Sequence, residues 1–596
     1  MIKYKLSVQD PHSHLFDVEI TIDAEELTQL KLSLPAWIPG SYMIRDFARN
    51  ILSVHSKDAE VEINNIDKQQ WSISRKNQQA LGEITLGYRV FAYDLSVRSA
   101  YITDQYAFCN GTSVFLCVEE FKDARHEVIV DKSQLPKAWQ TITSMPVISA
   151  SQDVDNIRDF ACDNYLELID HPILIGDVTR QSFNVDGVTF HMVFTGKQDY
   201  DLARICKDLT PICRHHMSLF NEMPVPEYWF ITLICKNGFG GLEHSASTIL
   251  QYARDGIPKI GEAGSIDDAY RDFLSLCSHE LFHLWHVKRN KPEEFITPDL
   301  SQEVYTRQLW IYEGFTSFYD DVALARTKVI SPQEYAKILG TNITRLLRNP
   351  GRQLQSVTES SFYAWTKFYK QDASSVNHIV SYYLKGGLIA LALDIQIRQL
   401  SEGKSSLDNI MQHLWLDYGK QNIGTPDNIV HQLCEQYLGL NLDDFLSVAI
   451  DSTMDLPLLN LLESIGLKMQ LRFRNGNEDK GGLSSELQYH HDFGALLADQ
   501  AVGTKVTQVL AHRPANLAGL QLNDLIIAIN HWETNSKHLL KEISRLEAGS
   551  DCRLQVLRDG RLIELSLPIQ PAIPDTCFIE IADSNSFENW LYSKPQ

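Results

Sequence analysis

The hydrophobic pattern of this 596-residue chain changes its period twice, and this change limits the folds that the chain can adopt. From residue 1 to about 170, short segments such as KYKLSV and HLFDVEITI alternate apolar and polar residues, as strands with one buried face do. Long stretches of helical period follow, and strand-like segments return after about residue 463. Because a chain of this length also exceeds one hydrophobic core, the sequence predicts a multidomain α+β protein.

The changes of period predict four segments along the chain. We expect an N-terminal β-sandwich domain at 1–170, a mostly helical domain at 171–462, a β-rich domain at 463–572 and a C-terminal tail at 573–596. Within the second segment, VPEYWFITLICKNGFGGLEHSASTIL is expected to form a buried strand, a Gly-rich loop and a second strand.

The charge balance of the chain disfavours two classes of partner. Lys and Arg number 54 against 76 Asp and Glu, which gives a net charge of -22. This charge repels phosphate backbones and anionic lipids, so we expect neither nucleic acid nor membrane as a partner. The N-terminus lacks the pattern of a secretory signal, and the ten cysteines form no CxxC pair. A cytoplasmic protein with reduced, buried thiols is therefore expected.

The motif with the clearest chemistry is HELFH, in which His279 and His283 are four residues apart. On a helix this spacing places both imidazoles on one face, where they can bind the same metal ion, typically Zn²⁺. The surrounding stretch SIDDAYRDFLSLCSHELFHLWHV has a capping start and a helical apolar stripe. Glu280 would lie beside the metal and act as general base in the hydrolysis of a peptide bond.

A zinc site of this type needs a third ligand, for which His286, Glu303 and Glu313 are the downstream candidates. Three ligands from successive turns of one straight helix rarely converge on one tetrahedral ion, so His286 is the weakest of them. Glu313 lies in the aromatic segment LWIYEGFTSFYDD, whose burial would hold a carboxylate firmly, whereas Glu303 lies in the polar segment SQEVYTRQ. We predict Glu313.

The order HELFHLW, LWIYEGFTSFY and YYLKGG resembles the motif order of the aminopeptidase N superfamily. With LPAWIPGSYMIRDFARN, GFGGLEHSAS and the PDZ-like segment PANLAGLQLNDLIIAIN, the chain more closely resembles the bacterial glycyl aminopeptidase family of PDZ-bearing metallopeptidases. The resemblance implies a thermolysin-like zincin catalytic domain followed by a PDZ domain. It also implies one Zn²⁺ per chain and peptide substrates with a free N-terminus, with small residues such as Gly or Ala preferred.

The resemblance implies roles for further residues. Glu243 matches the glutamate that pairs with the substrate's α-ammonium group, and the adjacent Gly240 and Gly241 belong to the same substrate-binding motif. Tyr383 matches the tyrosine that stabilises the developing oxyanion, although the neighbouring Tyr382 is a rival for this role. The chain departs from the family at His286, where an Asn is usual.

The PDZ-like segment and its neighbourhood leave alternatives open. Phe493–Leu496 could bind the carboxylate of a peptide C-terminus, or the domain could only shape access to the active site. Tyr42 and Arg45 could face the substrate cleft. At the level of function, the rivals of an aminopeptidase are an endopeptidase that recruits proteins through its PDZ domain and a catalytically silent peptide-binding scaffold.

Overall fold

The structure is a computed structural model that describes residues 2–148, 157–262, 264–476, 478–484 and 489–593. It divides into two compact units, which are treated separately below. The first unit comprises Met1–Val304 and Met411–Thr425, and the second comprises Tyr305–Ile410 and Pro426–Gln596.

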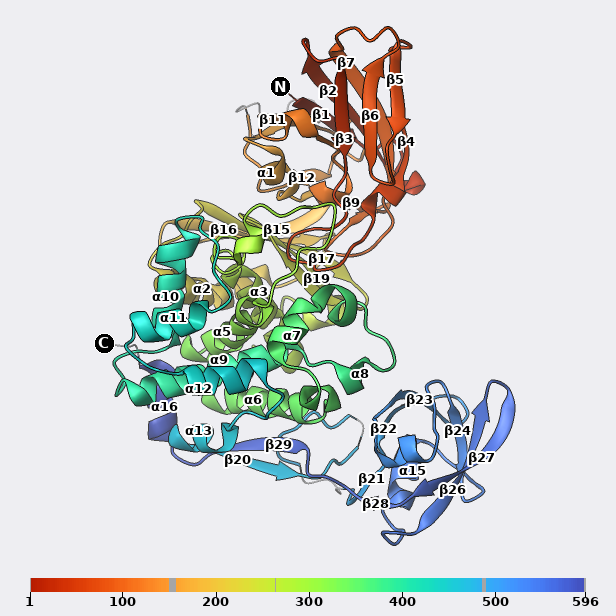
Figure 1. Ribbon diagram of the computed structural model, residues 1–596, viewed down its shortest axis with the longest axis vertical. Coiled ribbons are helices and arrows are strands. Elements are labelled where there is room, and N and C mark those ends of the chain that lie inside the picture. The colour runs from red at the N-terminus through yellow and green to blue at the C-terminus, as the bar shows by residue number, and fades with distance from the viewer. Residues whose placement is uncertain (1, 149–156, 263, 477, 485–488, 594–596) are drawn as a thin grey trace. The chain divides into compact units, whose positions relative to one another are not determined.

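The first unit begins with a β-sandwich (Figure 1). Its larger sheet has the order β13-β11-β1-β2-β7-β4, and its smaller sheet has the order β10-β3-β6-β5. Apolar residues alternate along the strands and meet in one core shared by both sheets, to which Val18, Leu32 and Ile73 contribute. The strands are β1 (Ile2–Ser7), β2 (Leu15–Ala24), β3 (Gln29–Ser33), β4 (Ile51–Ser56), β5 (Val61–Asn65), β6 (Gln70–Arg75), β7 (Gly82–Phe91), β10 (Cys117–Val118), β11 (His126–Asp131) and β13 (Ile157–Cys162).

A third sheet, of order β12-β14-β9-β8, and the short helix α1 (Tyr165–Ile169) belong to the same unit. Its strands are β8 (Ala100–Ile102), β9 (Tyr106–Cys109), β12 (Gln140–Ile142) and β14 (Ile173–Gly176).

A five-stranded sheet of order β15-β16-β17-β19-β18 completes the first unit. Strands β16, β17 and β19 are parallel, and the helix α2 (Leu202–Phe220) connects β16 to β17, as a parallel crossover requires. The helix α3 (Asp268–Phe282) packs on α2, β18 and β19. The strands are β15 (Val178–Val185), β16 (Val188–Thr195), β17 (Glu227–Cys235), β18 (Phe239–Glu243) and β19 (Ser247–Ala253).

This sheet corrects one sequence prediction. The Gly-rich stretch between the two expected strands is itself the edge strand β18 and not a loop. Its glycines weaken the strand signal, because glycine has low β propensity and no side chain to pack.

The helices of the second unit surround α9 (Tyr382–Leu400), which is mostly buried. Helix α9 contacts α5 (Gly314–Arg326) so closely that a Cβ atom on Gly314 would lie 2.6 Å from the backbone of Gly386. This backbone contact explains Gly314 of EGF and Gly386, the first glycine of KGG. The other helices are α4 (Leu309–Tyr312), α6 (Pro332–Leu347), α7 (Val357–Phe362), α8 (Ser375–His378), α10 (Leu407–His413, whose end belongs to the first unit), α11 (Ile429–Gln436), α12 (Asp443–Leu446) and α13 (Leu458–Ser464).

One helical stretch within the described residues, Ser375–Leu400, is long and apolar enough to cross a membrane by length and composition alone. In this structure 78% of its most apolar 18-residue segment is buried inside the protein.

A PDZ-like domain forms the later part of the second unit. Its sheet follows the order β22-β23-β24-β26-β27, with β25 paired to β24, and it has its own core around Val506, Ile526 and Leu554. The elements are β22 (Ala495–Asp499), β23 (Thr504–Val509), α14 (Pro514–Leu517), β24 (Leu525–Ile529), β25 (Trp532–Glu533), α15 (Ser536–Ile543), β26 (Asp551–Arg558) and β27 (Arg561–Pro568). The predicted order of β-sandwich, helical middle and PDZ domain is confirmed.

The chain returns from the PDZ domain to the helices of the second unit. Strand β29 (Thr576–Ile581) pairs antiparallel with β20 (Leu467–Arg472), and β28 (Gln570–Pro571) pairs with β21 (His491–Asp492). The last helix, α16 (Ser584–Tyr592), is anchored by Trp590, whose Nε1 donates a hydrogen bond of 2.8 Å to Asp394 of α9. The residues predicted as a tail thus contain a strand and a helix of the folded unit.

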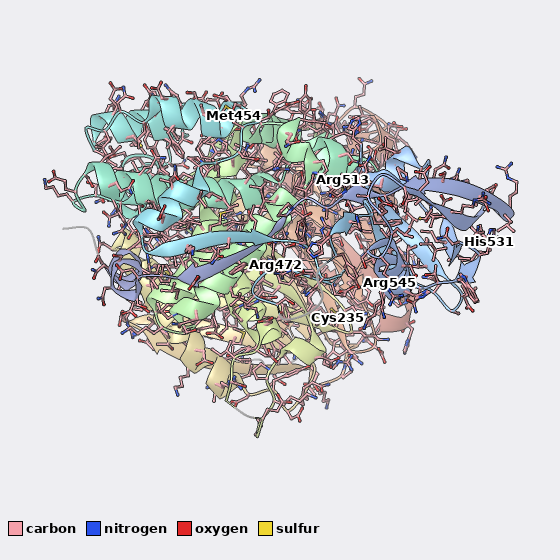
Figure 2. The ribbon with its side chains drawn as sticks, turned by 90° about the horizontal axis from the view of Figure 1, so that it is seen from below. Cys235, Met454, Arg472, Arg513, His531 and Arg545 are labelled. Atoms are coloured by element: carbon pink, nitrogen blue, oxygen red, sulfur yellow. The ribbon has the colours of Figure 1, made fainter. Side chains whose placement is uncertain are left out.

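Ion pairs fix the connections at which the PDZ domain begins and ends. Arg472, at the end of β20 (Figure 2), forms two buried hydrogen bonds of 2.6 and 2.8 Å with Asp479. Arg474 and Arg348 both pair with Asp575, which precedes β29. These contacts join both connections to the helical part of the unit.

Candidate metal centre and substrate site

The two histidines of the HELFH motif come from the end of helix α3. Asp267 caps the start of this helix by accepting a hydrogen bond from the backbone N–H of Tyr270. At its other end, the Nε2 atoms of His279 and His283 lie 3.0 Å apart. The Nδ1 atom of His283 lies 2.8 Å from the backbone oxygen of His286 and donates to it, so the lone pair that a metal ligand needs is on Nε2.

A third donor completes a group suited to a metal ion. Ligand atoms of His279, His283 and Glu313 all lie within 4.8 Å of one another. Glu313 is buried at the junction of α4 and α5. Two imidazoles and one carboxylate are the donor set of a catalytic zinc site, which keeps a fourth position for water or substrate. His286 and Glu303 are not members of this group; His286 instead contacts Asn290 through a hydrogen bond of 3.1 Å.

Glu280 points from α3 towards strand β18. Its side chain is buried, and Oε2 lies 3.4 Å from the hydroxyl of Thr248 on β19. A Cβ atom on Gly241 would overlap the Glu280 carboxylate, so only glycine at this position leaves room for it. A Cβ atom on Gly240 would meet no described residue this closely. Strand β18 therefore lies directly against the predicted general base.

Glu243 ends the same strand, two residues after Gly241. It is only 4% exposed, and its Oε1 atom is buried with no hydrogen-bond partner among the described residues. A Cβ atom on Gly40 would overlap this carboxylate, and Gly40 has a φ of 89°, which also favours glycine. Because a buried carboxylate without a partner is costly, this oxygen is well placed for a ligand that carries positive charge.

Glu243 and Gly40 line a cavity of about 800 Å³ in the first unit. Aromatic side chains from the segment WIPGSY and its surroundings form part of the wall, namely Trp37, Tyr42 and Phe295. Of the two residues predicted to face the cleft, Tyr42 lines this cavity, whereas Arg45 does not and bonds to Ser41.

The cavity wall also carries several cations. Lys288 pairs with Asp170 at 2.8 Å, and Arg289 donates to the backbone oxygens of Leu284 and Ser245. Lys291 has no ion-pair partner within the described part of the chain. Burial, together with the nearby charge of Lys288, lowers its pKa from the ordinary 10.5 to about 8.

We expect Lys291→Met to stabilise the protein at neutral pH. Below about pH 8 the folded protein must hold the partly buried ammonium charge of Lys291, and the difference between its two pKa values corresponds to about 3 kcal/mol. The gain from the substitution should be largest below pH 8, shrink as the pH rises and vanish above about 10.5. Thermal unfolding at pH 7 and pH 10 measures it, with the exposed Lys137→Met as control. An equal gain at both pH values would contradict the assignment.

Tyr383 lies in the first turn of α9. Its hydroxyl is 3.2 Å from that of Tyr369, and the two rings of Tyr383 and Tyr382 stack at 4.8 Å between centroids. Burial, and then the charge of Glu313, raises the pKa of Tyr383 well above its ordinary value. The phenol therefore keeps its proton at neutral pH and can serve as a hydrogen-bond donor. Tyr382 is fully buried in the core of the helices.

Two positions near these groups escaped the sequence analysis. Gly40, 203 residues before Glu243, fits against its carboxylate, and Tyr369 contacts Tyr383 from a separate segment. The motif WIPGSY gave a signal for Gly40, since a Pro-Gly pair between aromatic residues marks a fixed turn. No comparable signal marks Tyr369.

The predicted carboxylate-binding loop of the PDZ domain borders a small hollow of about 40 Å³. Phe493, Gly494 and Ala495 line it together with Arg513, which pairs with Asp492. Gly494 has a φ of 76°, and a Cβ atom there would overlap the Arg513 side chain. The Phe493–Ala495 backbone and a guanidinium group thus lie side by side (Arg513 is labelled in Figure 2).

Comparisons with known proteins agree along the length of the chain. Residues 3–177 match the Peptidase M61 N-terminal domain, residues 272–389 match M61 glycyl aminopeptidase, and residues 471–569 match a PDZ domain. The crystal structure of an aminopeptidase N family protein from Idiomarina loihiensis is 38% identical in sequence. The match covers 100% of both chains, with a TM-score of 0.95.

More distant structures resemble part of the chain. An M1 zinc metallopeptidase from Deinococcus radiodurans is 13% identical, with 77% of this chain and 94% of that chain covered and a TM-score of 0.48. Native yeast LTA4 hydrolase is also 13% identical, with 78% and 70% covered and a TM-score of 0.46. No protein of curated function matches the sequence significantly.

Proposed function

The chain belongs to the M61 glycyl aminopeptidase family of zinc metallopeptidases, and on this basis we propose that it removes single small residues, Gly or Ala, from the free N-terminus of peptides. The observation that carries the exopeptidase assignment is a buried carboxylate oxygen of Glu243 that has no hydrogen-bond partner among the described residues. Glu243 ends the strand that contacts Glu280. A free α-ammonium group satisfies this carboxylate, whereas an acylated N-terminus leaves it unpaired.

The zinc ion would be held by His279, His283 and Glu313, one ion per chain. When bound, zinc supplies Lewis acidity towards the scissile carbonyl and lowers the pKa of a water molecule. The Glu280 carboxylate accepts the proton of the attacking water and passes it to the leaving amine. Glu243 binds the α-ammonium group and so places the first peptide bond within reach of Glu280. The hydroxyl of Tyr383 donates a hydrogen bond to the developing oxyanion.

The experiment that tests this proposal compares glycyl and alanyl anilides, each with a free and an N-acetylated amine. We expect zinc-loaded protein to cleave only the free amines. Cleavage of the acetylated substrates would instead favour an endopeptidase, and no cleavage by metal-loaded protein would favour a peptide-binding scaffold. A series from Gly and Ala to Leu and Phe then tests the preference for small residues, because the cavity of about 800 Å³ beside Glu243 also has room for larger side chains.

Tyr383→Phe is expected to lower kcat by on the order of 100-fold with little change in KM, because the hydroxyl acts only on the transition state. Steady-state kinetics on alanyl anilide measures both constants. Tyr382→Phe is the matched control, since it removes a hydroxyl from the adjacent ring. If Tyr382→Phe lowers kcat and Tyr383→Phe does not, the roles of the two tyrosines are exchanged.

The second part of the proposal concerns the PDZ domain, which would bind the C-terminal carboxylate of a peptide at Phe493–Leu496. The backbone N–H groups of such a loop and the nearby Arg513 suit a carboxylate. Binding of a fluorescent peptide with a free C-terminus, but not of its C-terminal amide, is the expected result.

A further inference from the structure

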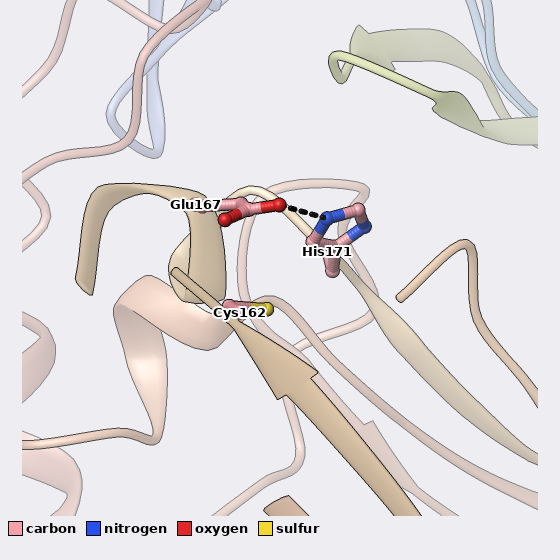
Figure 3. A group of neighbouring side chains, drawn as sticks. All are labelled: Cys162, Glu167 and His171. Atoms are coloured by element: carbon pink, nitrogen blue, oxygen red, sulfur yellow. Dashed lines mark ion pairs between the residues drawn. The ribbon is translucent and has the colours of Figure 1, made fainter. Parts of the chain in front are cut away.

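A second group of potential metal ligands lies in the first unit and includes none of the residues of the HELFH site. Ligand atoms of Cys162, Glu167 and His171 all lie within 4.8 Å of one another. Figure 3 shows the three side chains around a common space, with the 4.0 Å contact between Glu167 and His171 drawn as a dashed line. The first residue ends β13, the second lies in α1, and the third follows that helix.

From this geometry we propose that Cys162, Glu167 and His171 form a second metal site, which binds a divalent transition metal ion of the zinc type. Thiolate, imidazole and carboxylate together suit Zn²⁺ or Co²⁺, whereas Mg²⁺ and Ca²⁺ prefer oxygen ligands alone. With three protein ligands, the fourth position would be taken by water.

The imidazole of His171 is already oriented for such a role. Its Nδ1 atom lies 2.8 Å from the hydroxyl of Ser144, and that hydroxyl donates its own proton to Ser247. Ser144 therefore accepts a hydrogen bond from Nδ1–H of His171, which leaves the lone pair on Nε2. Nε2 is the atom that faces Glu167, at 4.0 Å from Oε1. A hydrogen bond of this kind commonly fixes the tautomer of a metal-ligating histidine.

The carboxylate of Glu167 is held at one oxygen and available at the other. Its Oε2 atom accepts a hydrogen bond of 2.7 Å from the backbone N–H of Asp163, and Oε1 faces His171. The ligands of a tetrahedral zinc ion lie about 3.4–3.8 Å apart. The ligand atoms must therefore approach one another by at most about 1.4 Å to bind the ion. The side chain of Glu167 is 36% exposed and can make this movement, whereas Cys162 and His171 are buried.

The surroundings of Cys162 favour a cation. Its thiol has no hydrogen-bond partner among the described residues, and burial raises its pKa, with further contributions from Glu167, Asp163 and Asp170. The negative potential of these carboxylates stabilises the protonated form of the thiol. The same potential attracts a divalent ion, which can displace the thiol proton and bind the sulfur. Glu167 and His171 also line the 800 Å³ cavity, through which an ion can enter.

Cobalt provides a specific test, because a thiolate ligand gives Co²⁺ an intense charge-transfer absorption in the near ultraviolet. The HELFH site has no sulfur donor, so this absorption reports only the second site. Metal-free full-length protein is titrated with Co²⁺, and bound metal is counted by mass spectrometry of the element. We expect two equivalents and the thiolate band for the unmodified protein, and one equivalent without the band for Cys162→Ser.

Two further variants complete the experiment. Cys109→Ser removes an equally buried thiol of the same unit and should keep both equivalents and the band. His171→Gln should weaken the band even if Cys162→Ser fails to fold. Absence of the band from the unmodified protein, or its persistence in Cys162→Ser, would overturn the proposal. If only the HELFH site fails to bind, one equivalent remains and carries the band, so the two sites are tested separately.

Discussion

Replacing Glu280 with Gln is expected to lower kcat/KM for glycyl and alanyl anilides by on the order of 10²–10⁴-fold. The amide cannot accept the proton of the attacking water, yet it has nearly the same shape as the carboxylate that fits against Gly241 and Thr248. Because Glu280 is not among the three predicted ligands, the variant should bind zinc as tightly as the unmodified protein. The prediction therefore separates catalysis from metal binding.

Zinc content and steady-state kinetics must be measured on the same preparation of this variant. Loss of zinc together with activity would mean that Glu280 holds the metal site together and that its role as base is untested by activity alone. Full activity with zinc bound would exclude it as the base.

Replacing Glu313 with Gln is expected to remove the metal. The neutral amide is a poor zinc ligand, and only His279 and His283 would remain. Since the loss of an outer hydrogen-bond partner already costs roughly 10–100-fold in affinity, the loss of a direct ligand should cost more. The protein should be isolated without stoichiometric zinc at the HELFH site and without activity.

Glu303→Gln is the matched control for this prediction, because Glu303 was the rival carboxylate in the sequence and lies outside the group of ligand atoms. It should keep both zinc and activity. Competition with a chelator of known affinity gives the dissociation constant of each variant. Equal zinc affinity of Glu313→Gln and the unmodified protein would show that another residue supplies the third ligand.

The sequence predicted the parts of this protein that depend on local pattern. Alternation of apolar residues predicted the sandwich, and the spacing of His279 and His283 predicted a shared helix face. The burial of Glu313 likewise follows from an aromatic segment that could be recognised as buried, whereas its role as a zinc ligand stays a prediction. The period of the hydrophobic pattern, the helix-capping residues and the residue types can all be read from a short stretch of sequence.

The parts that could not be predicted depend on contacts between distant segments. Strand β18 looks like a loop because its glycines carry no strand signal, but Gly241 is needed where the Glu280 carboxylate lies against it. The fit of Gly40 against Glu243 and the pairing of Tyr369 with Tyr383 likewise join separate segments. Nothing in a short window specifies such partners, so they appear only in the folded chain.

The antiparallel pairing of β20 with β29 means that the PDZ domain is an insertion and not an appendage. Arg472, the last residue of β20, is paired with Thr576, the first residue of β29. The chain therefore leaves the helical part of the second unit and returns to it at the same place. A truncated chain that stops before β29 loses that strand, α16 and the Trp590 anchor, and the truncation would damage the helices instead of testing the PDZ domain. A clean excision would join residues 472 and 576 through a short β-turn, which is the connection that adjacent antiparallel strands naturally accept.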